Sequence, residues 1–460
     1  MYAALITGAL NSMAARFITI EYVNKDYNKA NLYYNSIFWG KLIVVSVLLL
    51  PAVYLIVRLD NLVVIPSDIM LDVKVLFSFI FMSFFINSSF PNWECGTYVT
   101  NRLDRDYLPN MATTVMRCLI IFMMMTILVP KVWYIGFASC ITSILLLIVR
   151  GYNTHKLTPY LRLGLKKGER QYSWIAVKEL TSSGIWNSIS QVGILLLLGL
   201  DLILCNLYLG ATAMGVVALS KIFPNYMSQL SGSVQGAFGA ELTINYAKGN
   251  MEDIYRDINK AMKITSFIII VPIACIVVFG YQFFTLWVPS QDAYLLQTLS
   301  VLATLGYMFT SGTQILYNVF STVNKVKQNA IAILISGVCS MFITIILVKF
   351  TDLGIYAVAG VSTFVNLVRN MSFTLPQTAM YLGFNWKRFF PQVLQTVFTS
   401  IILISVGYLV KPYLPVGSWF ALFVTMTIFA TVAFTISWFI LLNKSERRIF
   451  ISKISNKIKR

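Results

Sequence analysis

Two cations inside long apolar stretches, Lys221 and Arg369, are the residues with the clearest chemical potential. Each lies several residues from either end of its stretch, so its side chain cannot easily reach an aqueous boundary. Ionisable residues in such positions usually face a protein interior or a wet cavity, because a charge in hydrocarbon is costly. We therefore expect Lys221 and Arg369 to face a cavity inside the protein.

Uncharged polar side chains lie on the same helix faces as these cations. Steps of three or four residues keep side chains on one face, and such steps connect Lys221, Asn225, Gln229, Gly232 and Gln235; Tyr307, Thr310, Gln314 and Tyr317; Ser362, Asn366 and Arg369; and Ser183, Asn187 and Gln191. These stripes offer amides and hydroxyls for hydrogen bonds, together with aromatic rings. Two interpretations stay open: a wet cavity between two bundles, or hydrogen bonds between helices, each worth about 0.6 kcal/mol.

Other charged residues lie closer to the predicted membrane boundaries. Arg16, Lys41 and Arg117 are near cytoplasmic helix ends, where they either contact substrate or reach lipid phosphates. Asp201 and Glu241 are the acids nearest to the membrane in the second half of the chain, and both are candidates for coupling to an ion. Asp201 either carries a coupling H⁺ or Na⁺ or pairs with Lys221. No other cofactor is indicated.

The motifs of common enzymes and metal sites are missing from the sequence. It contains no Gly-x-x-x-x-Gly-Lys-Ser/Thr loop for nucleotide phosphates, no Gly-x-Ser-x-Gly and no His-Glu-x-x-His. Its six cysteines are scattered and predict packing residues, and its single histidine, His155, has no metal-ligating neighbour. The acids Asp60, Asp68 and Asp72 are typical of a solvated loop. We expect no catalytic activity and no metal.

The apolar stretches that carry these residues predict a polytopic helical membrane protein. Of the 460 residues, 57% are hydrophobic and only 12% are charged, whereas soluble domains carry about 25% charged residues. A helix of about 20 apolar residues crosses the hydrocarbon core. Thirteen such spans are expected, at 2–20, 36–57, 75–94, 112–129, 132–150, 182–205, 213–240, 261–282, 294–320, 329–348, 354–380, 389–410 and 418–442.

The distribution of basic residues predicts the orientation of these spans. The chain has 36 Lys and Arg against 18 Asp and Glu. With Met1 outside, 26 of the 36 fall in cytoplasmic segments and five in outer ones. Cytoplasmic loops of membrane proteins carry such an excess, so nucleic acid binding is not needed to explain the charge. We expect a multi-pass protein with a cytoplasmic C-terminus.

An internal repeat predicts two homologous halves. Thr7–Asn11 aligns with Ser231–Gln235, and Ile18–Tyr22 aligns with Leu242–Tyr246, both at an offset of 224 residues. Because both copies run from outside to inside, the halves are parallel, which is a known transporter plan. The first half then lacks the counterpart of 182–205, so about 40–45 N-terminal residues with one helix are expected to be missing.

The repeat defines the expected architecture of this all-α chain. Two six-helix bundles are followed by two C-terminal helices, with the first helix of the first bundle missing. The N-terminal bundle is 1–154, a basic cytoplasmic linker is 155–181, the C-terminal bundle is 182–382, and the helix pair with a basic tail is 383–460. The linker either lies at the membrane surface and contacts anionic lipid or is solvated.

Several short motifs resemble bacterial polysaccharide flippases, which move O-antigen or capsule repeat units and belong to the multidrug/oligosaccharidyl-lipid/polysaccharide exporter superfamily. They are Ser183-Gly184-Ile185-Trp186, Leu200-Asp201, Tyr208-Leu209-Gly210, Ala247-Lys248-Gly249-Asn250 with Lys260, Tyr22-Val23-Asn24-Lys25-Asp26, and Asp352-Leu353-Gly354-Ile355-Tyr356-Ala357. The resemblance extends over nearly the whole chain. Glu241 departs from it, since a proline or small residue is expected there.

The resemblance implies a flippase in the bacterial cytoplasmic membrane. Such proteins move undecaprenyl-diphosphate-linked oligosaccharide to the outer leaflet by alternating access. Cavity cations hold the diphosphate, so the resemblance gives Lys221 and Arg369 the anionic head of the substrate, while the amides and rings of the stripes would contact its sugars. An ion gradient can be coupled, and polysaccharide polymerase and glycosyltransferases are partners. Three alternatives remain: a drug or small-cation exporter of the superfamily, which predicts an acidic cavity; a membrane glycosyltransferase or polymerase, which needs a large outer loop; and a purely structural membrane protein.

Overall fold

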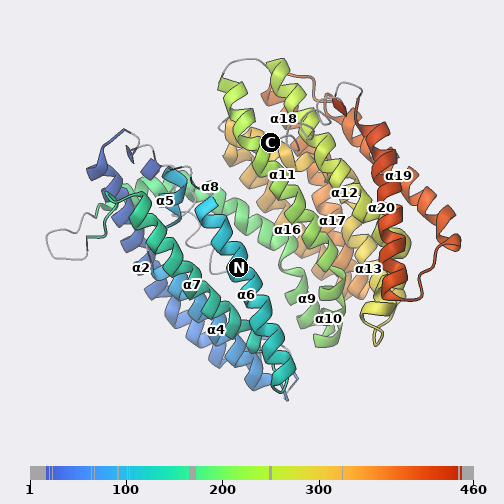
Figure 1. Ribbon diagram of the computed structural model, residues 1–460, viewed down its shortest axis with the longest axis horizontal. Coiled ribbons are helices and arrows are strands. Elements are labelled where there is room, and N and C mark those ends of the chain that lie inside the picture. The colour runs from blue at the N-terminus through green and yellow to red at the C-terminus, as the bar shows by residue number, and fades with distance from the viewer. Residues whose placement is uncertain are drawn as a thin grey trace. The chain divides into compact units, whose positions relative to one another are not determined.

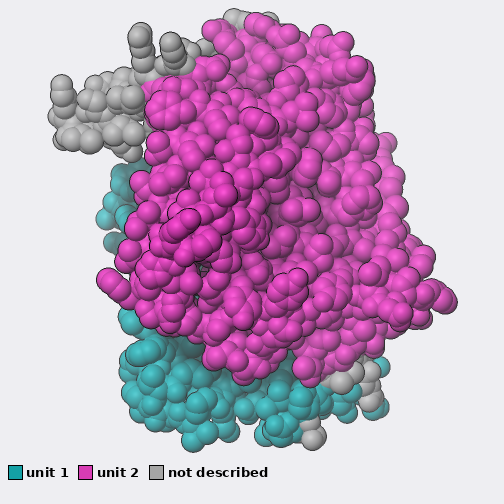
Figure 2. Space-filling model, turned by 90° about the vertical axis from the view of Figure 1, so that its right-hand side faces the viewer, with its two compact units in different colours: residues 1–192 teal, residues 193–460 magenta. Residues whose placement is uncertain are grey.

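The computed structural model describes residues 17–19, 21–22, 24–63, 65–66, 68–90, 93–100, 102, 104–164, 172–247, 251–323, 325–443 and 446–447, without the side chains of 61, 62, 98, 181, 183, 236, 237, 239–241, 243–245 and 247. These residues form helices, turns and loops and contain no strand (Figure 1). The all-α expectation is therefore confirmed. The chain forms two compact units, residues 1–192 and 193–460 (Figure 2).

Unit 1 is built around one long helix, α7. It packs against α4, α5 and α6, while α2 packs against α4. The helices that begin in unit 1 are α2 (Tyr27–Val57), α3 (Leu59–Leu62), α4 (Met70–Ser89), α5 (Glu94–Val99), α6 (Asp104–Ile127), α7 (Tyr134–Leu157) and α8 (Trp174–Leu198).

Unit 2 is built around α12 (Met251–Trp287), most of whose apolar residues are buried. Helices α11, α13, α19 and α20 pack against it, and α17 packs against α9, α13 and α16. The other elements are α9 (Asp201–Leu209), α10 (Ala211–Ser220), α11 (Ile222–Ala247), α13 (Ala293–Leu305), α14 (Tyr307–Thr310), η1 (Gly312–Ile315), α15 (Leu316–Thr322), α16 (Val326–Phe350), α17 (Gly354–Arg369), η2 (Asn370–Thr374), α18 (Leu375–Tyr381), α19 (Phe390–Val410), η3 (Lys411–Tyr413) and α20 (Trp419–Leu441).

Ten helical segments of the described chain are long and apolar enough to cross a membrane. Many of their apolar side chains are exposed, Leu50 and Phe420 among them, as expected of surfaces that face lipid. Three of the thirteen expected spans are not among the ten. Almost all of 2–20 lies outside the described residues, and 213–240 and 354–380 are interrupted helices.

The interruption in 213–240 has a local cause. Pro224 has no N–H to bond the carbonyl of Ser220, the residue four positions earlier. The hydroxyl of Ser300 donates to that carbonyl instead, at 3.2 Å. Helix α10 ends at Ser220, Lys221 forms a turn, and α11 begins at Ile222. The break therefore places Lys221 at the junction of the two helices.

The interruption in 354–380 is a π-helical turn, η2, which also lies beside a proline. The N–H of Leu375 bonds the carbonyl of Asn370, five residues earlier, and Pro376 follows within the first turn of α18. Such π-turns are often found at functional sites, because they rotate side chains away from the regular helical phase. Arg369 and Asn370 lie at the start of this turn.

Glycine allows α8 and α16 to approach closely within unit 2. A Cβ atom on Gly337 would lie 2.5 Å from the carbonyl oxygen of Gly193, and one on Gly193 would lie 2.7 Å from the Leu334 nitrogen. Gly232 has no such role, because a Cβ atom there would meet nothing within 4 Å.

The six cysteines have free thiols. Four are buried, and Cys118 and Cys339 are exposed. Cys95, on the short helix α5, is fully buried, and burial raises the pKa of its thiol to about 12. It packs among apolar residues as a protonated side chain.

We predict that Gly337→Ala destabilises unit 2 by about 1–3 kcal/mol, because the added methyl group must push α8 and α16 apart. The midpoint of thermal unfolding in detergent measures the effect. Gly360→Ala is the matched control, since a Cβ atom on that helical glycine meets nothing within 4 Å. Equal midpoints for the two variants would contradict the close packing.

Candidate functional site

Arg369 is the centre of a polar network in unit 2. Its Nη2 donates to the hydroxyl of Tyr317 and, at 2.8 Å, to Oδ1 of Asn366. Its guanidinium also lies over the Tyr317 ring, 5.4 Å from the centroid. The Tyr317 hydroxyl in turn donates to Oδ1 of Asn370 at 2.9 Å, and Thr313 donates to the same oxygen at 3.2 Å. The side chains of α15, α17, η1 and η2 thus converge on one guanidinium.

The network leaves the charge of Arg369 without a counter-ion among the described side chains. None of the ion pairs in the described chain includes Arg369. The residue is 7% exposed, and its Nε has no hydrogen-bond partner although it is buried. A buried charge without a partner is strongly unfavourable. The site is therefore suited to an anion, which would supply both the charge and the missing acceptor.

Lys221 has a different environment. Its ammonium forms an ion pair with the carboxylate of Asp201 at the start of α9, and both residues are buried. Gly210, with φ of 89°, makes the turn between α9 and α10 that lets these two helices pack together. The positive charge of Lys221 is therefore already compensated, and its ammonium occupies the place of a cation beside Asp201.

The other predicted site residues are dispersed. Tyr307 is buried with Met227, Ile269 and Ile273, and Gln314 is half-buried. Asn187 is half-buried, whereas Gln191, Asn225 and Arg117 are exposed. Lys41 is buried and donates to the carbonyl of Phe90 at 3.4 Å. Arg16 and the side chain of Glu241 lie outside the described residues.

Sequence reasoning missed part of the Arg369 network. Asn370 lies four residues after Asn366, and Thr313 lies three after Thr310 and four before Tyr317, so both fit regular helical spacing. The predicted stripes continued through their neighbours Arg369 and Gln314 instead. In the structure Thr313 is in the 3₁₀ turn η1 and Asn370 is in the π-turn η2. The spacing to Asn366 and Tyr317 was the available signal.

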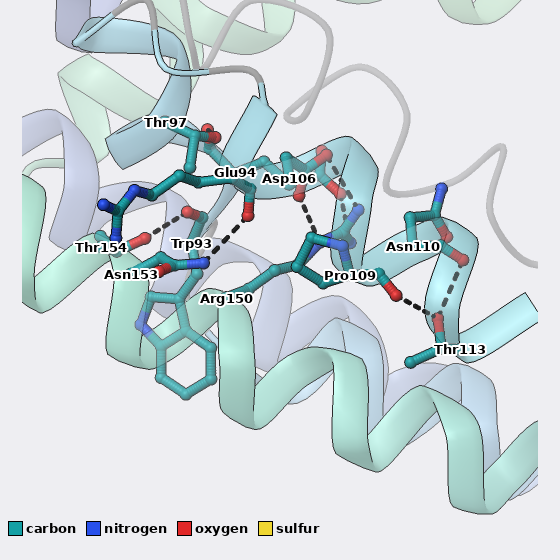
Figure 3. Close-up of polar contacts among 11 residues, drawn as sticks. Trp93, Glu94, Thr97, Asp106, Pro109, Asn110, Thr113, Arg150, Asn153 and Thr154 are labelled. Carbon is teal, nitrogen blue, oxygen red and sulfur yellow. Dashed lines mark hydrogen bonds and ion pairs between the residues drawn. The ribbon is translucent and has the colours of Figure 1, made fainter. Parts of the chain in front are cut away.

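A second charged cluster lies in unit 1, where α5, α6 and α7 meet (Figure 3). The guanidinium of Arg150 lies between two carboxylates: Nη1 is 2.6 Å from Glu94 Oε1, and Nε is 2.8 Å from Asp106 Oδ1. On the next turn, Asn153 donates to the carbonyl of Arg105 at 2.9 Å, and Thr154 donates to the carbonyl of Trp93. Arg150 is the last residue of the span expected at 132–150, and none of these three charged residues was among the predicted site residues.

The geometry of the described chain agrees with a known transporter fold. The chain is similar to an inward-facing multidrug resistance MATE family transporter of the MOP superfamily, with a TM-score of 0.60, 15% identity, and coverage of 83% of this chain and 87% of that one. It is also similar to the lipid II flippase MurJ in an inward closed conformation, with a TM-score of 0.64, 13% identity, and coverage of 95% and 90%. The chain therefore has the fold of the MATE and MurJ proteins.

One curated protein sequence is similar along almost the entire chain. It is EpsK of Bacillus subtilis (strain 168), described as an uncharacterized membrane protein, which is 24% identical over 453 residues. The alignment covers 98% of this chain and 88% of EpsK. No protein-family model matches the chain. The comparisons with solved structures therefore confirm the expected all-α fold, which is that of the MATE and MurJ proteins.

We predict that breaking the Lys221–Asp201 pair costs more than removing it. Lys221→Met alone and Asp201→Leu alone should each destabilise the protein by about 3–5 kcal/mol, because each leaves a buried charge unpaired. The double variant should recover most of that loss. Thermal unfolding in detergent measures all three, and additive losses in the double variant would show that the two charges do not interact.

We also predict that Arg150→Gln destabilises unit 1 by about 1–3 kcal/mol, since the mostly buried Asp106 loses its charge-assisted hydrogen bonds. Arg102→Gln is the control, because Arg102 pairs with Asp104 in an exposed position, where ion pairs contribute little. The unfolding midpoint should fall for Arg150→Gln and stay unchanged for Arg102→Gln. An equal fall of the unfolding midpoint in both variants would mean that the Arg150 cluster stabilises the protein no more than an exposed ion pair does.

Proposed function

We propose that this protein is a flippase that moves an undecaprenyl-diphosphate-linked oligosaccharide across the bacterial cytoplasmic membrane. The single observation that carries the proposal is the buried guanidinium of Arg369, which has a free Nε and no carboxylate partner among the described side chains. The fold supports it, because a lipid II flippase and a multidrug transporter share that fold.

The site would act by binding and desolvation, without making or breaking a covalent bond. A phosphoryl oxygen can accept from the free N–H groups of Arg369, and charge-assisted bonds of this kind are about twice as strong as neutral ones. Tyr317 and Asn366 fix the guanidinium through the Nη2 donor, so the remaining donors are held in position for the ligand. Asn370 and Thr313 hold Tyr317 in turn.

The roles proposed for the two membrane cations differ. Arg369 would hold the diphosphate. Lys221 would act on it only after leaving Asp201, because its charge is compensated in this conformation. By the same reasoning, Asp201 could accept H⁺ or Na⁺ only when Lys221 withdraws. Glu241 stays a further candidate for ion coupling.

The proposal includes an orientation and partners. The excess of basic residues in alternate loops places the C-terminus in the cytoplasm. The substrate would be delivered there by glycosyltransferases and used outside by a polysaccharide polymerase. The second candidate function is export of a small molecule, favoured by the likeness to a multidrug transporter. A buried cation without a counter-ion argues against a cationic drug as the substrate.

We predict that Arg369→Gln lowers flipping about 10- to 100-fold, the loss expected when a charged group forfeits hydrogen bonds worth about 1.5–3 kcal/mol. The gene is deleted in its own strain and complemented with wild type, with Arg369→Gln, or with Arg256→Gln as the control. Arg256 is an exposed arginine paired with Asp253. Surface polysaccharide and the leaflet distribution of lipid-linked units are measured at equal protein abundance.

The expected result is loss of surface polymer with finished units retained in the inner leaflet, for the deletion and Arg369→Gln alike. Normal polymer with Arg369→Gln would exclude Arg369 as the anion site. Normal polymer in the deletion strain would favour export of another molecule. Units that are never completed would show that the protein takes part in assembly and is not a flippase.

A further inference from the structure

Two asparagines on the first turns of α2 hold the chain that leaves α7. Asn31 donates to the carbonyl of Tyr160 at 2.7 Å and accepts from the N–H of Arg162 at 2.8 Å. Asn35, one turn further along, donates to the carbonyl of Arg162 at 3.0 Å and accepts from the N–H of Gly164 at 2.9 Å. Each side-chain amide bonds to alternate main-chain groups, as a neighbouring β-strand would. Residues 160–164 are thereby fixed along α2.

The far end of the same connection is held by the same helix. The N–H of Ser173 bonds the hydroxyl of Ser36 at 3.1 Å, and the hydroxyl of Tyr33 donates to Glu179 at 3.0 Å. Leu161 lies in one buried cluster with the first turns of α8 and with α2. The beginning and the end of the linker are thus both attached to α2, and the side chains that point away from this cluster have fixed places.

Those outward side chains form a surface of distinct composition. Leu161 is buried while Tyr160 is 54% exposed and Arg162 is exposed, as expected for alternating side chains of an extended segment. In the first turns of α8, the residues Ala176, Val177 and Leu180 are buried, whereas Trp174 is 64% exposed, Ile175 is 80% exposed and Lys178 is exposed. We call Tyr160, Arg162, Trp174, Ile175 and Lys178 the linker face.

The composition of the linker face matches the polar boundary of a bilayer. Tyrosine and tryptophan are enriched there because their rings have an apolar body and a polar edge. The exposed cations Arg162 and Lys178 would meet phosphates. The acid next to Lys178 is Glu179, which accepts from Tyr33. The nearby Glu21 is paired with Lys29 at 2.6 Å. Among the described residues, positive charge therefore predominates around the exposed apolar groups.

We propose that the linker face binds the headgroups of anionic phospholipids. Trp174 and Ile175 insert among the glycerol and upper acyl groups, while Arg162 and Lys178 contact the lipid phosphates. In the orientation proposed above, this is the inner leaflet. The asparagine pair makes the surface specific, because it holds Arg162 and Tyr160 in fixed places beside the first turns of α8. This role is independent of which substrate the protein moves.

The test is native mass spectrometry of the full chain in neutral detergent, titrated with phosphatidylglycerol or with phosphatidylcholine of the same acyl chains. A basic residue near an anionic surface contributes about fivefold in affinity. Arg162→Gln with Lys178→Gln should therefore weaken phosphatidylglycerol binding roughly 25-fold and leave phosphatidylcholine binding unchanged. Trp174→Ala with Ile175→Ser should weaken the binding of both lipids.

Lys131→Gln with Lys349→Gln is the matched control, since it removes the same charge from exposed lysines elsewhere. It should retain the preference of wild type for phosphatidylglycerol. The proposal is overturned if the control loses as much affinity as Arg162→Gln with Lys178→Gln, which would indicate a response to net charge alone. It is also overturned if the linker variant keeps the wild-type preference. All substituted residues are exposed, so the variants should stay folded and their lipid affinities can be compared directly.

Discussion

Inside an apolar helix bundle, a carbonyl or a charge needs a partner from the protein or from a bound ligand, because lipid offers none. A proline leaves one helix carbonyl without its usual partner, because proline has no backbone N–H. Pro224 frees the carbonyl of Ser220, which Ser300 satisfies, and the resulting turn presents Lys221 to Asp201. Pro376 accompanies the π-turn that begins directly after Arg369. Both membrane cations thus lie where the backbone leaves regular helical geometry, and the two irregularities define the polar chemistry of unit 2.

These two sites show how the same type of residue acquires different properties. Lys221 has a carboxylate partner, so the pair is electrically neutral and can stay buried. Arg369 has acceptors from neutral groups, Tyr317 and Asn366, which orient the guanidinium but do not cancel its charge. One cation is suited to holding helices together, and the other to holding an anion. The distinction depends on which side chains the neighbouring helices contribute: Asp201 from α9 for Lys221, and Tyr317, 52 residues earlier in the chain, for Arg369.

Much of the fold and part of the site could be predicted from the sequence. Composition and apolar spans predicted an all-α membrane protein, and helical spacing selected Tyr317, Asn366 and Arg369, which do converge. The same spacing rule also fits Asn370, four residues after Asn366, and Thr313, four residues before Tyr317, but the predicted stripes continued through Arg369 and Gln314 instead. The rule cannot choose between two neighbouring residues that both fit it. It also grouped Asn225 with Lys221, although Asn225 is exposed and Lys221 is buried. The partners of Arg150 were missed because counting basic residues per loop says nothing about where carboxylates lie.

The asparagine contacts on α2 have a consequence for how this protein can vary. Asn31 and Asn35 recognise only main-chain groups of Tyr160, Arg162 and Gly164. Every amino acid except proline presents the same N–H and C=O groups. Attachment of this segment is therefore largely independent of the side chains that it displays. Relatives could exchange those side chains to suit membranes of different lipid composition while retaining the same scaffold, so the surface is free to diversify under selection.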